Sequence, residues 1–264
     1  VSPFLADGSW NVTGTGLIGN GNNKVVSAYY NPVALFELSR YSSANDRIIG
    51  SLGATLNLLK GLDLSTTYAV DRLRTENIGF NSAKVGSSSP TTGGNAYNIS
   101  GLRDNWNWTT TLQYDLRKER SHLGALAGYD VQKFENSTWG ASVTQAADSY
   151  FENYQGTWGN ITPTGNSINA RAYLSYFGRL TYDYLDKYFF TLNYRRDGSS
   201  PLGANNKFGN FGGISAGWLI SEEDFFPKGA ALSSAKLKAS WGRVGNGNLN
   251  HAYGSLELYG ASLY

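Results

Sequence analysis

Several residue types are scarce or missing in this chain of 264 residues. Cysteine is absent, which excludes disulfide bonds and thiolate metal sites. Methionine is absent too, so we expect an internal fragment or a processed chain, and the opening Val1-Ser-Pro-Phe4 lacks the basic and apolar regions of a signal peptide. Charged residues make up only 16% of the chain, below the roughly 25% of soluble domains. The composition is therefore unusual for a soluble globular protein.

Long hydrophobic runs are also missing. No apolar stretch approaches the ~18 residues that a membrane helix needs. The absence of such a stretch argues only against a membrane helix, because a membrane-spanning β-strand is apolar only at every second position. The net charge of +2 indicates no particular partner, whereas glycine (32 residues) and tyrosine (18 residues) are abundant.

The clearest positive signal is an alternation of apolar and polar residues. In 105–117 the even positions run from Trp106 to Leu116 and are apolar or aromatic except for Thr110, whereas every odd position is polar. The same period of two recurs in 62–71, 170–184 and 236–243. This period is typical of β-strands that have one apolar face and one polar face.

A soluble β-sandwich would also alternate, but three features favour a membrane barrel. Several strands extend over ~12–16 residues, against the 5–6 of globular sheets. Tyrosine and tryptophan gather near strand ends, as in the aromatic girdles of outer-membrane barrels. Short connections at 60–61, 118–121 and 185–186 alternate with long ones at 81–104, 137–167 and 198–206, as periplasmic turns alternate with external loops. The predicted fold class is an all-β, antiparallel transmembrane barrel wall.

The expected organisation has two parts. Residues 1–45 are predicted to be rich in loops, with room for one short strand at 23–30, and residues 46–264 to form barrel strands. The expected strands are 46–59, 62–79, 105–118, 121–137, 168–184, 187–198, 207–221 and 235–245, with a ninth beginning near Ala252. An open sheet of about nine strands would leave backbone groups unpaired in lipid, so further strands must complete the barrel.

Several ordered motifs resemble one family. The clearest are Tyr176-Phe-Gly-Arg-Leu-Thr-Tyr182, Tyr194-Arg-Arg-Asp-Gly-Ser-Ser200, the stretch 215–226 and the stretch 237–246. They are similar in sequence and order to the barrel of the SusC/RagA-like TonB-dependent transporters of Bacteroidetes-type bacteria. The resemblance implies a large barrel, 22-stranded in this class, that is filled by an N-terminal plug domain not visible in these residues.

The same resemblance implies a function and partners. Such proteins import oligosaccharides or peptides across the bacterial outer membrane. A SusD-like surface lipoprotein acts as a lid, and the TonB–ExbB–ExbD complex supplies energy through the plug region. Two alternatives stay open, namely a soluble or surface-attached β-domain that binds glycans, and a passive porin.

Candidate functional residues follow from the two faces and the long connections. The lipid-facing candidates are Trp108, Leu112, Leu174, Leu180, Leu192 and Trp241. The candidates for contact with the plug on the polar face are Asn107, Gln113, Arg171, Arg179 and Asp183. Four aromatic residues of the long connection 137–167 are candidates for contact with substrate or lid, with packing of the loop as the alternative: Trp139, Tyr150, Tyr154 and Trp158.

Signals for enzymatic chemistry are weak. The stretch 14–19 matches G-x-G-x-x-G, but the Asn-Gly-Asn-Asn that follows breaks helices, so a dinucleotide site is not predicted. The two histidines, His122 and His251, are expected at opposite ends of strands, too far apart to act together. No catalytic residues, cofactor or metal site are predicted.

Overall fold

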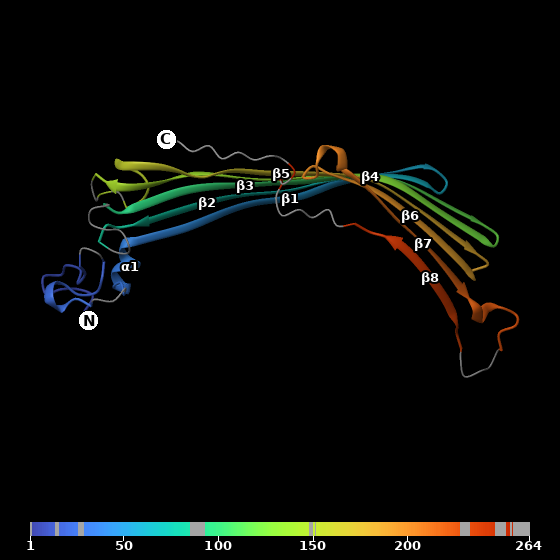
Figure 1. Cartoon of the computed structure of the whole chain (residues 1–264), viewed down its shortest axis with the longest axis horizontal. Helices are drawn as coiled ribbons and strands as arrows, with labels where there is room; N and C mark the ends of the chain where they lie inside the picture. Colours follow the sequence, from blue (N-terminus) through green and yellow to red (C-terminus); the bar gives the residue numbers. More distant parts are fainter. Residues whose placement is uncertain are drawn as a thin grey trace. The chain divides into compact units, whose positions relative to one another are not determined.

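The chain forms one long sheet in the computed structural model. The described residues are 2–13, 16–25, 29–84, 93–147, 150, 152–227, 233–245, 252–253 and 255. The strands among them are β1 (Ser39–Leu59), β2 (Leu62–Asn81), β3 (Asn95–Lys118), β4 (Ser121–Ala146), β5 (Trp158–Tyr184), β6 (Tyr188–Ser199), β7 (Phe208–Leu219) and β8 (Lys236–Arg243). They follow one another across the sheet in sequence order (Figure 1). Sequence patterning therefore predicted the fold class and these strands, whereas most of the expected ninth strand lies outside the described residues.

The chain divides into two compact units, which are described separately. The first comprises Val1–Ile48, Arg72–Arg103 and Asn136–Asn169, and the second Ile49–Asp71, Asp104–Glu135 and Ala170–Tyr264. Strands β1 to β5 contribute to both units, whereas β6, β7 and β8 belong to the second.

The first unit contains a helix that the sequence pattern did not reveal. Helix α1 (Pro32–Leu38) begins at Asn31, whose side-chain oxygen accepts hydrogen bonds from the backbone N–H groups of Val33 (3.1 Å) and Ala34 (3.3 Å). Proline at the first helical position is favourable because its missing N–H would be unpaired there anyway. Where a strand was expected at 23–30, the described residues show the 3-10 helix η1 (Gly21–Asn23) and an isolated bridge from Tyr30 to Leu17.

No helix among the described residues is both long enough and apolar enough to cross a membrane.

Several strands are longer than the alternation predicted. Strand β1 begins at Ser39 rather than at 46, and β3 begins at Asn95 rather than at 105. Strand β4 continues to Ala146, and β5 already begins at Trp158. The expected loop 137–167 was therefore wrong in its bounds. The physical reason is that backbone pairing continues where polar and apolar residues are mixed on each face, as around Ala96 and Val143, and period-two patterning cannot detect such segments.

The first unit holds a small apolar cluster of Phe80, Ala96 and Val143, with Tyr154 and Trp158 packed against it. Across all described residues, the buried hydrophobic side chains are these three with Ala34 and Ala252. A soluble sheet is stabilised by burying one face against another layer. The described part of this chain has almost no such core, so its large apolar side chains are left on a surface.

The turns of the second unit are tight. Gly61, between β1 and β2, has φ +78°, which is in the left-handed region. Its carbonyl accepts a hydrogen bond from the backbone N–H of Asp115 at 2.7 Å, and a Cβ at this position would overlap the Asp115 carbonyl oxygen. Glycine is therefore required sterically at this turn. The turn between β5 and β6 uses Leu185 and Asp186, which also have positive φ values of 57° and 54°.

Candidate functional site

The register of β5 to β8 separates the side chains onto two faces. These strands pair antiparallel, and facing residues share one side of the sheet. Two rows on one side are polar or small: Arg179–Asn193–Gly213–Gly242 and Thr181–Thr191–Ser215–Ser240. Three rows on the other side are apolar: Leu180–Leu192–Ile214–Trp241, Tyr182–Phe190–Ala216–Ala239 and Tyr184–Tyr188–Trp218–Leu237. We call these sides the polar face and the apolar face.

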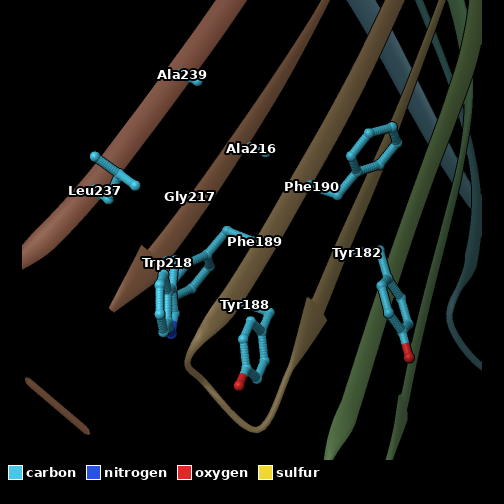
Figure 2. Close-up of a pocket in the computed structure, with 9 residues that line it drawn as sticks. All are labelled: Tyr182, Tyr188, Phe189, Phe190, Ala216, Gly217, Trp218, Leu237 and Ala239. Atoms are coloured by element: carbon cyan, nitrogen blue, oxygen red, sulfur yellow. The ribbon is translucent and has the colours of Figure 1, made fainter. Parts of the chain in front are cut away.

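Among the described residues of the second unit, large side chains of the apolar face stay exposed. Leu192 is 41% exposed, and Trp241 is 69% exposed. A hollow of about 440 Å³ lies over small residues such as Ala216 and Ala239, with aromatic rings including Tyr182 and Trp218 at its sides (Figure 2). Such an aromatic, uncharged surface suits a hydrocarbon environment with an interfacial girdle.

The aromatic end of this face is tied to the connection that follows β7. Glu223 accepts hydrogen bonds from the Tyr188 hydroxyl (2.5 Å) and from Trp218 Nε1 (3.0 Å), and Lys187 Nζ lies 3.5 Å from its carboxylate. The bonds from Tyr188 and Trp218 lower the pKa of the Glu223 carboxyl, because they stabilise its charged form. Glu223 is therefore expected to be ionised and to orient these two rings.

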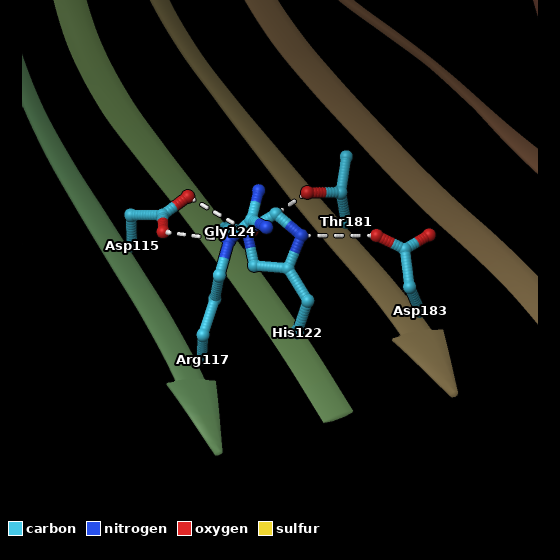
Figure 3. A network of polar contacts seen from close by, with 6 residues as sticks. All are labelled: Asp115, Arg117, His122, Gly124, Thr181 and Asp183. Atoms are coloured by element: carbon cyan, nitrogen blue, oxygen red, sulfur yellow. Dashed lines mark hydrogen bonds and ion pairs between the residues drawn. The ribbon is translucent and has the colours of Figure 1, made fainter. Parts of the chain in front are cut away.

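At the turn end of the polar face, a histidine bridges two carboxylates. His122 is the second residue of β4, next to the turn and away from the middle of the strand. Its Nε2 lies 2.7 Å from Asp115 on β3, and its Nδ1 lies 3.1 Å from Asp183 on β5 (Figure 3). Thr181 supports this arrangement by donating to the carbonyl of Gly124 at 3.3 Å. The bridge joins three neighbouring strands at one end.

The stability of this end of the sheet is expected to depend on pH through the bridge. The pKa of His122 is raised above its ordinary value, mainly by the hydrogen bond to Asp115, while Arg117, 3.9 Å from Asp115, opposes the shift. A raised folded-state pKa stabilises the fold fully below the unfolded-state value of about 6.5, and this contribution disappears as pH rises through the folded-state value.

We therefore expect the urea midpoint of the receptor carrying this chain to fall as pH rises from about 6 to about 8.5. The substitution His122→Gln keeps a neutral polar side chain at this position and should flatten that dependence. The measurement is unfolding in detergent micelles, followed by tryptophan fluorescence at a series of pH values. Parallel pH curves for the two proteins would contradict the assigned role of His122.

A second polar cluster lies further from this turn. Arg195 Nη2 donates to the buried Ser175 hydroxyl at 2.9 Å, and its Nε donates to Asp197 at 2.6 Å. The next residue, Arg196, points to the other side, where its guanidinium lies 5.0 Å from the centre of the Phe208 ring. The side chains of these two adjacent arginines of the motif 194–200 thus lie on opposite faces of the sheet.

The predicted polar-face residues can now be placed. Arg179 donates from Nε to the Asn193 side chain at 2.9 Å, and Asp183 belongs to the His122 bridge. Asn107 borders a separate hollow described below, Gln113 is exposed, and Arg171 is half-buried. Contact of these five with a plug stays a prediction.

The four predicted aromatic residues divide into two pairs. Tyr154 and Trp158 pack against the cluster of the first unit, and Trp158 Nε1 donates to the carbonyls of Tyr154 (3.1 Å) and Gln155 (3.0 Å). By contrast, Trp139 is 58% exposed and Tyr150 is 84% exposed. Their role in substrate or lid contact remains a prediction, for which the exposed pair is better placed.

Sequence reasoning missed the bridge through His122. Asp115 and His122 flank the turn 118–121, so hairpin pairing alone could have brought them close, but the third partner, Asp183, is distant in sequence. Within the described residues, no group of three or more His, Asp or Glu side chains is arranged to hold a metal ion. In the bridge, the two carboxylates lie at opposite nitrogens of the ring and so share no common point for a cation.

Comparison with known proteins identifies the sheet. No model of a known protein family matches the chain. The structure of the RagAB peptide transporter matches with a TM-score of 0.69 at 21% identity, covering 91% of this chain and 26% of that one. The RagAB peptide importer in its open-open state matches with a TM-score of 0.71 at 23% identity over the same shares. These likenesses establish the fold.

Sequence relatives decide the family. TonB-dependent receptor P26 of Formosa agariphila is 32% identical over 243 residues, covering 86% of this chain and 23% of that receptor. TonB-dependent receptor SusC of Bacteroides thetaiotaomicron is 30% identical over 176 residues, covering 65% of this chain and 17% of SusC. The chain belongs to the SusC/RagA-like TonB-dependent receptors.

Membership in this family explains the two faces. The sheet of this SusC/RagA-like chain corresponds to the barrel wall of TonB-dependent transporters, and the chain spans about a quarter of the length of P26. These relatives are named as receptors and transporters. They confirm the expectation that the SusC/RagA-like chain is not an enzyme.

Proposed function

We propose that this chain forms part of the wall of an outer-membrane receptor that actively imports oligosaccharides or peptides. In this proposal the apolar face meets lipid, and the polar face lines the lumen and contacts a plug domain. A SusD-like lipoprotein covers the outer opening, and the TonB–ExbB–ExbD complex provides energy through the plug region. Among the similar proteins, the RagAB transporter is named for peptides, which supports that cargo class. The oligosaccharide class is what the resemblance to SusC/RagA-like transporters implies.

The observation that carries the proposal is the separation of side chains in the paired rows of β5 to β8. The row Leu180–Leu192–Ile214–Trp241 is wholly apolar, whereas the adjacent row Thr181–Thr191–Ser215–Ser240 is wholly polar. A single sheet that is apolar on one side, with no covering layer among the residues that the structure describes, fits lipid on that side and water or protein on the other. A soluble glycan-binding domain would need a second layer over the apolar face.

The test is an uptake experiment in cells that express the receptor carrying this chain. The probes are fluorescent maltoheptaose and a fluorescent tryptic digest of casein, compared in wild-type and receptor-deleted cells. The proposal expects the deletion to abolish uptake of one probe class and a protonophore to stop that uptake in wild-type cells. Uptake that persists with the protonophore would indicate a passive porin, and a receptor that stays in buffer without detergent would indicate the soluble alternative.

The two exposed aromatics give a more local prediction. We expect the double substitution Trp139→Ala and Tyr150→Ala to reduce uptake several-fold through lost cargo or lid contacts. It should change the free energy of unfolding by no more than about 0.5 kcal/mol, because both side chains lie at the surface.

The matched control is Trp158→Ala on the packed pair. It should lower the free energy of unfolding by about 1–2 kcal/mol, because Trp158 is only partly buried against the Phe80 cluster. Uptake measured at equal receptor levels compares the two variants. Unchanged uptake in the double variant would remove these aromatics from the cargo and lid path.

A further inference from the structure

A hollow on the polar face of β1 to β4 has the chemistry of a binding site. Its volume is about 690 Å³, and residues from all four strands line it. The small side chains of Ser51 and Ala69 belong to this lining, next to the amides of Asn105 and Asn107. Alternation places these residues on the same face as Thr109 and Asp115, two and eight positions along β3 from Asn107. All the lining residues belong to the second unit.

Two side chains of this hollow are held in place by neighbours. Gln132 donates from Nε2 to Asp130 at 2.6 Å, and the same carboxylate accepts from the Thr109 hydroxyl at 2.6 Å. Asp130 is buried, so this short network fixes the Gln132 amide and leaves its second N–H and its carbonyl for other partners. The Phe134 ring lies edge to face with Tyr173, with centroids 6.0 Å apart at 76°. The geometry is thus partly preorganised.

We propose that this hollow binds a neutral sugar ring of an oligosaccharide cargo. Three carboxamides can each donate and accept hydrogen bonds, as sugar hydroxyls require, and Phe134 offers an apolar surface for the C–H groups of the ring. The lining contains no Lys or Arg and one carboxylate, Asp71, so the hollow would repel a sulfate or carboxylate of an acidic cargo, while that carboxylate can accept hydrogen bonds from sugar hydroxyls. The inference rests on the proposed function and adds a cargo class and a place on the wall.

The position along the strands agrees with a cargo site. Asn107 precedes the end of β3 at Lys118 by 11 positions. At ~3.3 Å per residue and a tilt of ~35–45°, the hollow lies roughly 25–30 Å from the short turns. That distance is at or beyond the far side of an apolar band about 25 Å tall. In the proposed orientation the hollow is near the outer opening, where arriving cargo meets the wall.

Calorimetry on the purified full receptor in detergent tests the proposal, with maltoheptaose, xylohexaose and a neutral Ala–Ser peptide as probes. Phe134→Ala should weaken binding of an oligosaccharide roughly five- to tenfold by removing the ring surface. Asn107→Ala should weaken it about three- to tenfold through lost hydrogen bonds. Ser65→Ala is the matched control, because Ser65 lies on the same face of β2 as the lining residue Ala69 but outside the hollow.

The binding results separate the sugar site from the proposed import function. Weaker oligosaccharide binding in Phe134→Ala and Asn107→Ala, with wild-type affinity in Ser65→Ala, supports the sugar site. Weakened binding of the peptide alone would overturn the cargo class. Unchanged oligosaccharide affinity in both variants would overturn the site while the proposed import stands, whereas a wild-type receptor that neither binds nor imports any probe would overturn both. If Phe134→Ala fails to assemble, Phe134→Leu and Asn107→Ala give the same decision.

Discussion

Arginine in place of Leu192 should destabilise the assembled receptor by about 2–4 kcal/mol. Leu192 lies on the apolar face in the row with Leu180, Ile214 and Trp241. This row lies between the tyrosines Tyr182 and Tyr188 on one side and Tyr194 on the other, so we place it near the middle of the bilayer. A guanidinium there loses its hydration without gaining a partner.

The matched control is Thr191→Arg, because Thr191 is the adjacent residue and faces the polar side. Thr191→Arg should lower the stability of the receptor less than Leu192→Arg does, since in the proposed orientation the polar face meets water or protein. The measurement is urea unfolding of the receptor reconstituted in lipid vesicles, with heat-dependent gel migration as a check of assembly. Equal stability of Leu192→Arg and wild type would contradict the lipid-facing assignment.

Alanine at position 61 should lower the free energy of unfolding by about 2–4 kcal/mol. Gly61 has φ +78°, and its Cβ would collide with the Asp115 carbonyl oxygen of the neighbouring strand. The backbone would have to shift, which would also weaken the hydrogen bond from Asp115 N to Gly61 O, 2.7 Å long in the native chain. The same urea measurement reports the change.

Gly50→Ala provides the comparison for this substitution. A Cβ at Gly50 meets nothing within 4 Å, so the expected change is within about 0.5 kcal/mol. A similar cost at both positions would show that glycine content, rather than the geometry of this turn, sets the stability. A cost confined to position 61 would locate the steric requirement at the turn.

The alternation of residues predicted the fold class well, because a sheet with one apolar face and one polar face constrains every second residue of its strands. In 105–117 and 170–184 this rule is visible without any structure. It fails at Asn95–Asp104 and Trp158–Ser167, where the strands continue but both faces carry polar residues. Helix α1 was missed for another reason, since its seven residues are too few for a helical period to be detected.

The candidate sites were less predictable than the fold. Alternation of residues along a strand assigns side chains to one face or the other, and it assigns Asn107 and Asp183 to the polar face. Which of them meet depends on pairing between strands that are distant in sequence. Asp183 reaches His122 across 61 residues, and the sugar hollow needs four strands in register. A single sequence holds no information on such pairing beyond the hairpin turns.

The two adjacent arginines of β6 have a consequence for how the wall is built. The Arg195 side chain lies on the polar face, and the Arg196 side chain lies on the apolar face, where it packs over the Phe208 ring. A slip of β6 by one residue in its pairing would exchange the two faces of that strand and turn Thr191, Asn193 and Arg195 toward hydrocarbon. In the proposed orientation, a wrongly paired hairpin would place polar and charged side chains in hydrocarbon, which is energetically costly. The bilayer would therefore favour insertion of the hairpin with the correct register.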